Sequence, residues 1–156
     1  MTKNPEISEY VIAAVPFNMV DVLWDKIEPH LHRVVNVAHG EITCDSVKTR
    51  LKSGSAVLVT ISKGTEVVAV NTLEVRVMDS GLRTLFIPIV GGDELDGWIN
   101  EFLKIAKAIA RDYKCTELRG LAARKGWMRK LEQSGECNWE NVHMVVRCPV
   151  EDEIGE

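Results

Sequence analysis

The chain has 156 residues, which suits one ordinary domain and is too short for two. Hydrophobic residues make up 46% and charged residues 27%, a globular balance that excludes disordered, collagen-like and low-complexity chains. The net charge is -4, so no global basic field favours nucleic acid or an anionic membrane surface, and we expect neither as a partner.

The sequence also bears on compartment and on metals. No apolar stretch approaches the roughly 20 residues that span a bilayer, and the N-terminal segment lacks the apolar block of a secretory signal. We therefore expect a cytoplasmic protein with reduced cysteines. Cys137, His143 and Cys148 are the set that most resembles zinc ligands, but structural zinc sites present their ligands in close pairs, so we predict no metal site.

The first elements follow from apolar spacing. Residues 10–15 form a short apolar run that ends at a proline, which predicts a strand followed by a turn. Pro29 should end or kink the next helix near Glu28, and that helix is predicted by apolar residues at helical spacing (Val20, Leu23, Trp24, Ile27, Leu31). His30 and His32 face different sides of a helix, so we expect solvated or capping side chains rather than a metal pair.

A short helix and a hairpin come next. Thr43 or Asp45 suits the N-terminal cap of a second helix, and Gly54 lies where a left-handed residue ends a helix. Residues 55–62 and 65–78 are rich in β-forming side chains on either side of a Lys-Gly pair. This pattern predicts two antiparallel strands joined by a tight turn.

The segment 84–90 is almost wholly apolar, which predicts a central strand that is buried on both faces. Pro88 interrupts it, and because proline cannot donate to the ladder, we expect a bulge or a gap in pairing there. The clearest helix of the chain follows, over about residues 94–113, with one apolar stripe (Leu95, Trp98, Ile99, Phe102, Ile105, Ala106, Ile109, Tyr113).

The segment 115–122 is the next predicted strand. A long helix joins it to the strand at 84–90, so the two strands should be parallel neighbours with a right-handed crossover. A short helix over 127–133 and a last strand over 142–150 follow, and the acidic residues 151–156 form a tail that should fray.

This order of elements resembles the GNAT superfamily of N-acetyltransferases over most of residues 10–150. The resemblance implies an α/β (α+β) fold, in which helices flank a mixed central sheet with splayed parallel strands, as a single domain over 1–150. Three local stretches look like the small GNAT-like proteins encoded by tailed bacteriophages (Gly91-Gly92 with Trp98, residues 115–120, residues 124–131).

The resemblance also implies a cofactor and its site. In the superfamily, acetyl-CoA lies where two parallel strands splay apart, and the turn after the first strand holds its pyrophosphate at a helix N-terminus. The positions that match here are those around the glycine turn, together with one residue of the basic segment further on (Ile89, Val90, Gly91, Gly92, Gly97, Arg124). That basic segment, from Arg119 to Lys130, either holds phosphate or is an ordinary solvated surface.

GNAT chemistry is direct attack of an amine on the thioester, so the implied acceptor is an amine on a small molecule or a protein. The reaction needs a base for the ammonium proton and a backbone donor for the thioester oxygen. Glu74, in the β-rich run, is the candidate base. Near Pro88, the amide of Ile89 or Val90 is the candidate donor.

Two features depart from the family pattern. Asp93, Glu94 and Asp96 place carboxylates where the pyrophosphate would be received, and they either repel it or cap the long helix at its positive end. The segment 124–139 lacks the tyrosine that usually acts in the family as the acid for the leaving thiolate, and Cys137 or Ser134 would be its substitute. A catalytically silent GNAT-fold module, acting as a phage virion component or a host-protein binder, is therefore the alternative to an acetyltransferase of phage type in the host cytoplasm.

Overall fold

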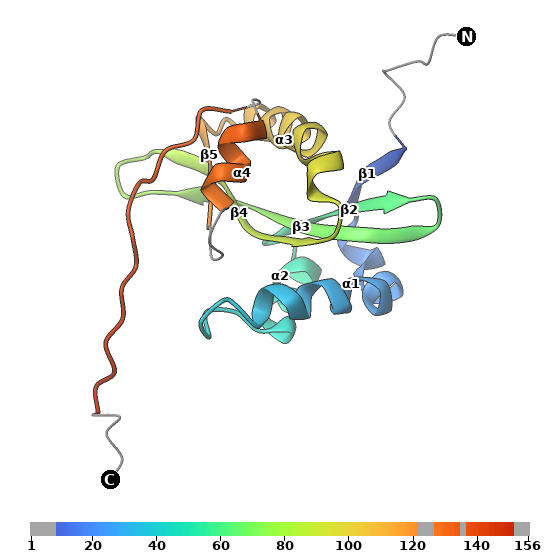
Figure 1. Ribbon diagram of the computed structural model, residues 1–156, viewed down its shortest axis with the longest axis horizontal. Coiled ribbons are helices and arrows are strands. Elements are labelled where there is room, and N and C mark those ends of the chain that lie inside the picture. The colour runs from blue at the N-terminus through green and yellow to red at the C-terminus, as the bar shows by residue number, and fades with distance from the viewer. Residues whose placement is uncertain (1–8, 122–126, 135–136, 152–156) are drawn as a thin grey trace.

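A computed structural model gives the structure of residues 9–121, 127–134 and 137–151 (Figure 1). One mixed sheet lies between two helical layers, with two helices on one face and two on the other. No helix among the described residues has the length and apolar character needed to cross a bilayer.

The sheet has five strands, which pair in the order in which they occur along the chain. Their bounds are β1 (Tyr10–Val15), β2 (Val57–Lys63), β3 (Glu66–Val77), β4 (Arg83–Gly92) and β5 (Glu117–Gly120). Pairing is antiparallel from β1 to β4 and parallel between β4 and β5. The predicted hairpin and the predicted parallel pair are both confirmed.

The helices divide between the two faces of the sheet. Their bounds are a 3₁₀ turn (Phe17–Met19), α1 (Val20–Val35), α2 (Cys44–Ser53), α3 (Leu95–Asp112) and α4 (Trp127–Ser134). Helices α1 and α2 cover one face and α3 covers the other, with α4 beside α3 (Figure 1). Helix α3 joins the parallel strands β4 and β5, and a crossover helix of this kind packs against one face of the sheet.

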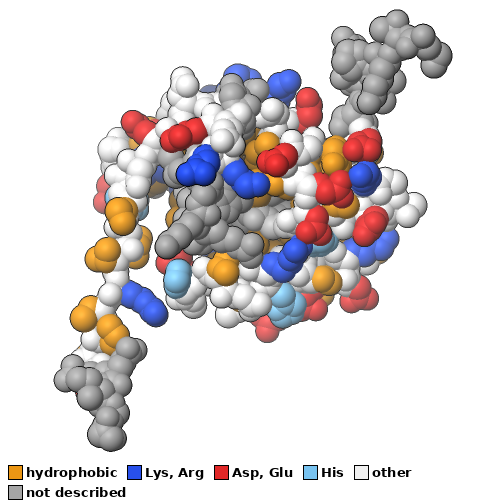
Figure 2. All heavy atoms as spheres, in the orientation of Figure 1, with side chains coloured by type: hydrophobic (Ala, Val, Ile, Leu, Met, Phe, Trp, Pro, Cys, Tyr) orange, Lys and Arg blue, Asp and Glu red, His pale blue; other side chains and the backbone are white. Residues whose placement is uncertain are grey.

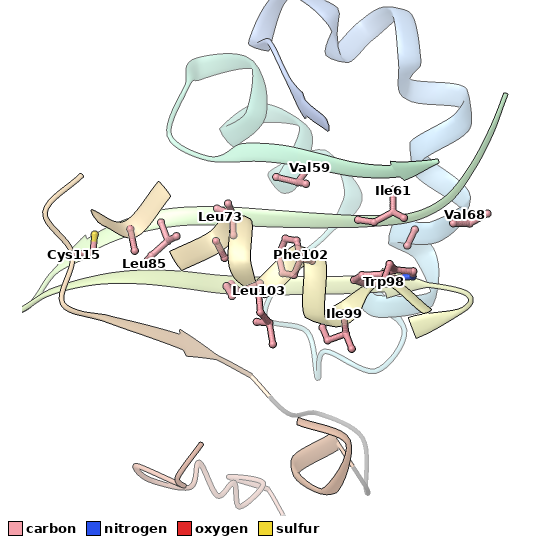
Figure 3. Close-up of a cluster of buried hydrophobic side chains, with 14 residues drawn as sticks. Val59, Ile61, Val68, Leu73, Leu85, Trp98, Ile99, Phe102, Leu103 and Cys115 are labelled. Carbon is pink, nitrogen blue, oxygen red and sulfur yellow. The ribbon is translucent and has the colours of Figure 1, made fainter. Parts of the chain in front are cut away.

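Each layer encloses its own apolar core. Under α3, the core is built around the fully buried rings of Trp98 and Phe102, whose centroids lie 6.1 Å apart in an edge-to-face contact (Figure 3). Under α1 and α2, it is built from Ile27, Leu31 and Leu51, each at most 1% exposed. The sheet is therefore apolar on both faces, as the run of residues 84–90 predicts.

Helix α1 continues through Pro29, so of the two outcomes predicted near Glu28 the helix end is wrong, and the kink stays a prediction. Ile27 and Leu31 lie on either side of the proline and are both completely buried, which anchors the two halves on the same core. His30 is not a solvated side chain either, because its Nε2–H donates to the carbonyl oxygen of Val67 on β3 at 2.9 Å.

The start and end of α2 follow the predicted capping chemistry. Thr43 is the N-cap: its side chain accepts a hydrogen bond from the Ser46 amide, and the Ser46 side chain accepts one from the Thr43 amide. Gly54 ends the helix in the left-handed conformation, with φ of 84°. Asp45, the alternative cap, lies in the first turn, where its charge favours the positive helix end.

The predicted last strand, 142–150, is wrong: none of the described residues after Ser134 forms a strand. The segment is rich in apolar residues, but the side chains of Val142, Met144 and Val146 are 58%, 76% and 83% exposed. Figure 1 shows this segment running away from the sheet. An apolar run makes a strand only where a neighbouring strand receives its backbone hydrogen bonds, and this segment has no such neighbour among the described residues.

Candidate functional site

The two parallel strands separate halfway along β4. Their last paired residues are Ile87 on β4 and Gly120 on β5, whereas β4 continues to Gly92. Beyond Ile87, β4 stays in register with β3 on its other side, with Thr72 opposite Ile89. Beyond Ile87, β4 therefore has backbone groups on that side that the described residues of β5 do not pair, as expected where two parallel strands splay apart.

Pro88 lies at this point of separation. The β3–β4 register shifts between Thr72 and Glu74, opposite the segment of β4 that contains Pro88. The predicted irregularity is therefore confirmed as a bulge-type register shift. It follows from the missing proline N–H, which cannot contribute to the ladder.

Glu74, the candidate base, lies beside Pro88. The Glu74 side chain is 13% exposed, and its carboxylate accepts a hydrogen bond from Arg76 Nη2 at 3.2 Å. The Arg76 guanidinium in turn lies 3.7 Å from the centroid of the Phe86 ring, which fixes its direction. The structure thus brings together the predicted carboxylate and the predicted strand irregularity.

A small cavity joins these residues to α2. Its volume of about 10 Å³ is room for about one water molecule. Side chains from the sheet and from the α2 region line it (Ile42, Val47, Arg50, Ala56, Thr72, Glu74, Pro88, Ile89). A larger groove, of about 380 Å³, lies between the end of α3, β5 and residues 137–139, and Cys137, a candidate substitute for the tyrosine acid, lines it. The small cavity is taken as the centre of the site because Glu74, Pro88 and Ile89 all line it.

The two glycines at the end of β4, Gly91 and Gly92, serve packing within the protein. A side chain on Gly92 would overlap the backbone of Ala69 and Val68, and Gly92 has φ of 137°. A Cβ on Gly91 would come within 2.6 Å of the Val34 side chain on α1. The space beside these two residues is filled by the protein itself, so the glycines allow β4 to approach β3 and α1 closely.

Gly97 has the same kind of role in α3. Its Cβ position lies 2.5 Å from the Tyr10 hydroxyl, and its amide donates to the Glu94 carbonyl at 2.9 Å. The Asp93 amide donates to Val68, and the Trp98 indole N–H donates to the Asp93 carbonyl, both at 2.8 Å. Trp98 is thus a core residue that also ties down the loop, and several loop amides are already used.

Glu94 is held by two partners from other elements. Its carboxylate receives hydrogen bonds from Lys63 Nζ at 3.0 Å and from the Tyr10 hydroxyl at 2.8 Å. These bonds, that of Lys63 first, hold the pKa of Glu94 below its usual range. Glu94 is the N-cap of α3, yet within the described residues its side chain makes no capping hydrogen bond, so the expected side-chain cap is wrong for Glu94.

The other two loop carboxylates also have cationic partners. Asp93 accepts a hydrogen bond from Arg33 of α1 at 3.0 Å, and Asp96 lies 3.6 Å from Lys130 of α4. Acidic and basic side chains lie side by side over the end of the molecule where α3 begins (Figure 2). The carboxylates are paired, and residues 91–97 as arranged do not fit a pyrophosphate, which would have to displace them.

Two residues of the basic segment, Arg119 and Lys130, are also paired with carboxylates. Arg119 donates to Glu117 on its own strand at 2.6 Å, and Lys130 pairs with Asp96. Arg124, predicted to contact the cofactor, lies outside the described residues. The binding roles of Ile89, Val90 and the three glycines stay predictions.

Comparison with known proteins identifies the fold. No protein-family model matches the sequence, and no curated protein sequence matches it. Among solved structures, a ribosomal-protein-alanine N-acetyltransferase from Brucella melitensis biovar Abortus 2308 is similar, with a TM-score of 0.64 at 15% identity over 89% of this chain and 99% of that chain.

Two further acetyltransferases show the same similarity. A GCN5-related N-acetyltransferase from Ralstonia eutropha JMP134 has a TM-score of 0.64 at 14% identity, covering 91% of this chain and 99% of that chain. A predicted acetyltransferase with acetyl-CoA from Clostridium acetobutylicum has a TM-score of 0.62 at 10% identity, covering 88% and 96%. At these identities the likeness establishes the fold, and the predicted GNAT-like fold class is confirmed.

Proposed function

We propose that this chain is an N-acetyltransferase that transfers an acetyl group from a thioester donor to an amine. The observation that carries the proposal is the separation of β4 from β5 after Ile87, with the nearly buried Glu74 beside it. A strand edge with unpaired backbone groups offers hydrogen bonds to an extended donor arm and to a thioester oxygen. The acetyltransferase neighbours support this assignment.

In this proposal Glu74 is the proton acceptor, and a backbone amide of β4 beyond Ile87 is the hydrogen-bond donor to the thioester oxygen. The attacking amine bonds to the acetyl carbonyl carbon of the donor as the carbon–sulfur bond breaks. The amine then loses a proton, and the donor leaves as a thiolate that takes up a proton from water. Glu74 takes up the amine proton through the one water molecule that the small cavity can hold. The amide of Ile89 or Val90 donates to the oxyanion that develops on the thioester carbonyl. Arg76 holds the Glu74 carboxylate in place.

The acidic loop limits which part of acetyl-CoA this site recognises. Asp93, Glu94 and Asp96 are committed to ion pairs, and a pyrophosphate near them meets like charge. The residues of β4 beyond Ile87, which border the opening, carry no charged side chain. The proposed recognition therefore rests on the thioester and its pantetheine arm, with acetyl-CoA as the natural donor class.

The direct test of the base is thiol release from acetyl-CoA in the presence of a panel of amines. A protein-only blank corrects for the four cysteines of the chain. We expect the parent to release thiol with at least one amine, and Glu74→Gln to lower kcat by about 10² to 10⁴. Glu66→Gln, an exposed site at the start of the same strand, is the matched control and should keep full activity. Equal kcat for Glu74→Gln and the parent would reject Glu74 as the base.

A second candidate function is favoured by the ion-paired loop itself. If Arg33, Lys63 and Lys130 hold the loop carboxylates permanently, the fold serves as a binding module for a phage or host protein and transfers nothing. Calorimetry separates the two functions. The module predicts no heat of binding with acetyl-CoA or with acetyl-pantetheine at millimolar concentration, whereas the enzyme predicts binding of at least one thioester.

A further inference from the structure

A side-chain cluster outside the candidate site joins α1 to the start of α2. Glu28 and His32 are one turn apart on α1, and Cys44 is the first residue of α2. The link between the helices, residues 36–43, folds the beginning of α2 back against α1. Cys44, which is 12 and 16 positions away from His32 and Glu28 in the sequence, thereby comes close to both.

The ligand atoms of this cluster are already close to metal-binding distances. Cys44 Sγ lies 3.8 Å from His32 Nδ1, and His32 Nε2 lies 4.0 Å from Glu28 Oε2. One ligand atom from each residue can be chosen so that all lie within 4.8 Å of one another. In a tetrahedral zinc site, neighbouring ligand atoms are about 3.3 to 3.7 Å apart. The two distances above involve different ring nitrogens of His32, so the set with one ligand atom per residue needs a contraction of up to about 1.5 Å.

The side chains that must move are free to do so. The Glu28 and His32 side chains are 42% and 59% exposed, so small rotations carry no packing penalty. Cys44 is half-buried against the α1–α2 core and is fixed by the helix that it begins. Cys44 can therefore stay in place while the Glu28 and His32 side chains rotate towards an ion. His30 takes no part, because its Nε2 is bonded to Val67.

The donor set selects the class of metal. Thiolate, imidazole and carboxylate together suit a borderline divalent cation, whereas magnesium and calcium prefer oxygen ligands alone. Three protein ligands also leave a fourth tetrahedral position for water. From this juxtaposition we propose that Glu28, His32 and Cys44 bind a zinc-type divalent ion that links α1 to α2.

The position of the link gives it a consequence for the candidate site. Ile42, just before Cys44, and Val47 and Arg50, on α2, line the small cavity that contains Glu74. An ion that holds the start of α2 against α1 would fix that wall of the cavity. The proposal does not rest on acetyl transfer, because the ligands and the binding test are independent of activity.

Cobalt is the most informative probe of this site. We expect Co²⁺ added to the full chain, reduced and freed of metal by a chelator, to give a thiolate-to-cobalt charge-transfer band and the visible bands of tetrahedral cobalt. Added Zn²⁺ should remove both. Cys44→Ser should abolish the charge-transfer band, and His32→Gln should weaken binding by about tenfold or more, since it removes a direct ligand.

The control is the double variant Cys137→Ser with Cys148→Ser, which removes the other candidate thiols and should leave the spectrum unchanged. Thermal unfolding provides a second readout, because Zn²⁺ should raise Tm for the parent and not for Cys44→Ser. A charge-transfer band that survives Cys44→Ser, or that disappears in the double variant, would overturn the assignment. So would the lack of any cobalt band with the parent at millimolar Co²⁺.

Discussion

Two regions of this chain, residues 84–90 and 142–150, are both rich in apolar residues but have different structures. The segment 84–90 is apolar and forms most of β4, where Leu85 and Ile89 are 2% and 1% exposed. The segment 142–150 is also rich in apolar residues, yet Val146 is 83% exposed and none of its described residues forms a strand. The first has a strand on each side and a helical layer on each face, and the second has neither.

The difference shows that a strand pattern is a conditional property. A β-strand is stable when its backbone groups are paired and its apolar side chains are covered. Strand β4 meets both conditions because β3 supplies its partner and α3 and α1 supply its cover. The predictions below sharpen this contrast, beginning with the variant that should have the largest effect.

Truncating one buried aromatic side chain should lower the free energy of unfolding far more than truncating an exposed apolar side chain. Phe102→Ala deletes a completely buried ring from the core under α3 and should lower the free energy of unfolding by about 3 to 5 kcal/mol. Val146→Ala should change it by less than about 0.5 kcal/mol. Urea denaturation of both variants measures the contrast. A loss of about 2 kcal/mol or more for Val146→Ala would approach the cost of truncating a buried side chain. It would mean that residues 142–150 are packed in solution.

The glycine at the end of β4 tests how closely the buried region is packed. Gly92→Ala places a methyl group against the backbone of Ala69 at positive φ, so we expect a loss of about 3 kcal/mol. Gly64→Ala has a positive φ but open space, and it should lose about 1 kcal/mol. Urea midpoints of the two variants provide the comparison. Equal losses would show that strain, rather than close packing, governs Gly92.

The ion pair at the start of α3 should give a pH-dependent effect. Lys63 and Tyr10 hold the pKa of Glu94 below its unfolded value, so their contribution is present above the unfolded pKa and is lost as pH falls through the folded pKa. Glu94→Gln should be less stable than the parent at pH 7. The difference should close as pH falls below about 4.

A double-mutant cycle with Lys63→Met identifies the partner. If the pair acts as described, Lys63→Met and Glu94→Gln together should lose less stability than the sum of the two single variants. Strict additivity at pH 7 would show that the contact makes no energetic contribution. The effect is small because both side chains are exposed.

The smallest effect is expected from shortening the chain. Ending it at Asn141 removes residues 142–156, whose described members are exposed throughout, and should change the free energy of unfolding by less than about 0.5 kcal/mol. It should also lower binding of a fluorescent apolar dye, since the exposed run of apolar side chains is removed. Thermal unfolding and dye fluorescence measure both. A large drop in Tm would contradict the contrast between the two regions.

Local chemistry made much of the fold predictable. Thr43 and Gly54 define the ends of α2 because capping depends on neighbouring residues alone. Pro88 marks the strand irregularity because its missing N–H acts wherever the strand lies. The helix end predicted at Pro29 is wrong because buried neighbours on both sides of the proline hold α1 together, which is a tertiary effect.

The site was less predictable, because its contacts join distant segments. Glu74 is the base predicted from the sequence, and that role stays a prediction. Its neighbours Arg50 and Ile42 come from the α2 region and carry no sequence signal. The cationic partners of the loop come from three separate elements and could not be seen in the loop sequence. The bacteriophage origin, the cytoplasmic location, the amine acceptor and any phage or host partner stay predictions.

The central claim is that donor recognition lies in the opening beside β4 and not at the acidic loop. Comparing kcat/KM for acetyl-CoA and for acetyl-pantetheine, with one amine acceptor, tests it most directly. Because the loop carboxylates are ion-paired and do not fit a pyrophosphate, we expect the two values to agree within about threefold, less than the tenfold that 1.4 kcal/mol represents. A preference for acetyl-CoA of about a hundredfold or more, equivalent to about 2.7 kcal/mol, would contradict the account and return the pyrophosphate to residues 91–97.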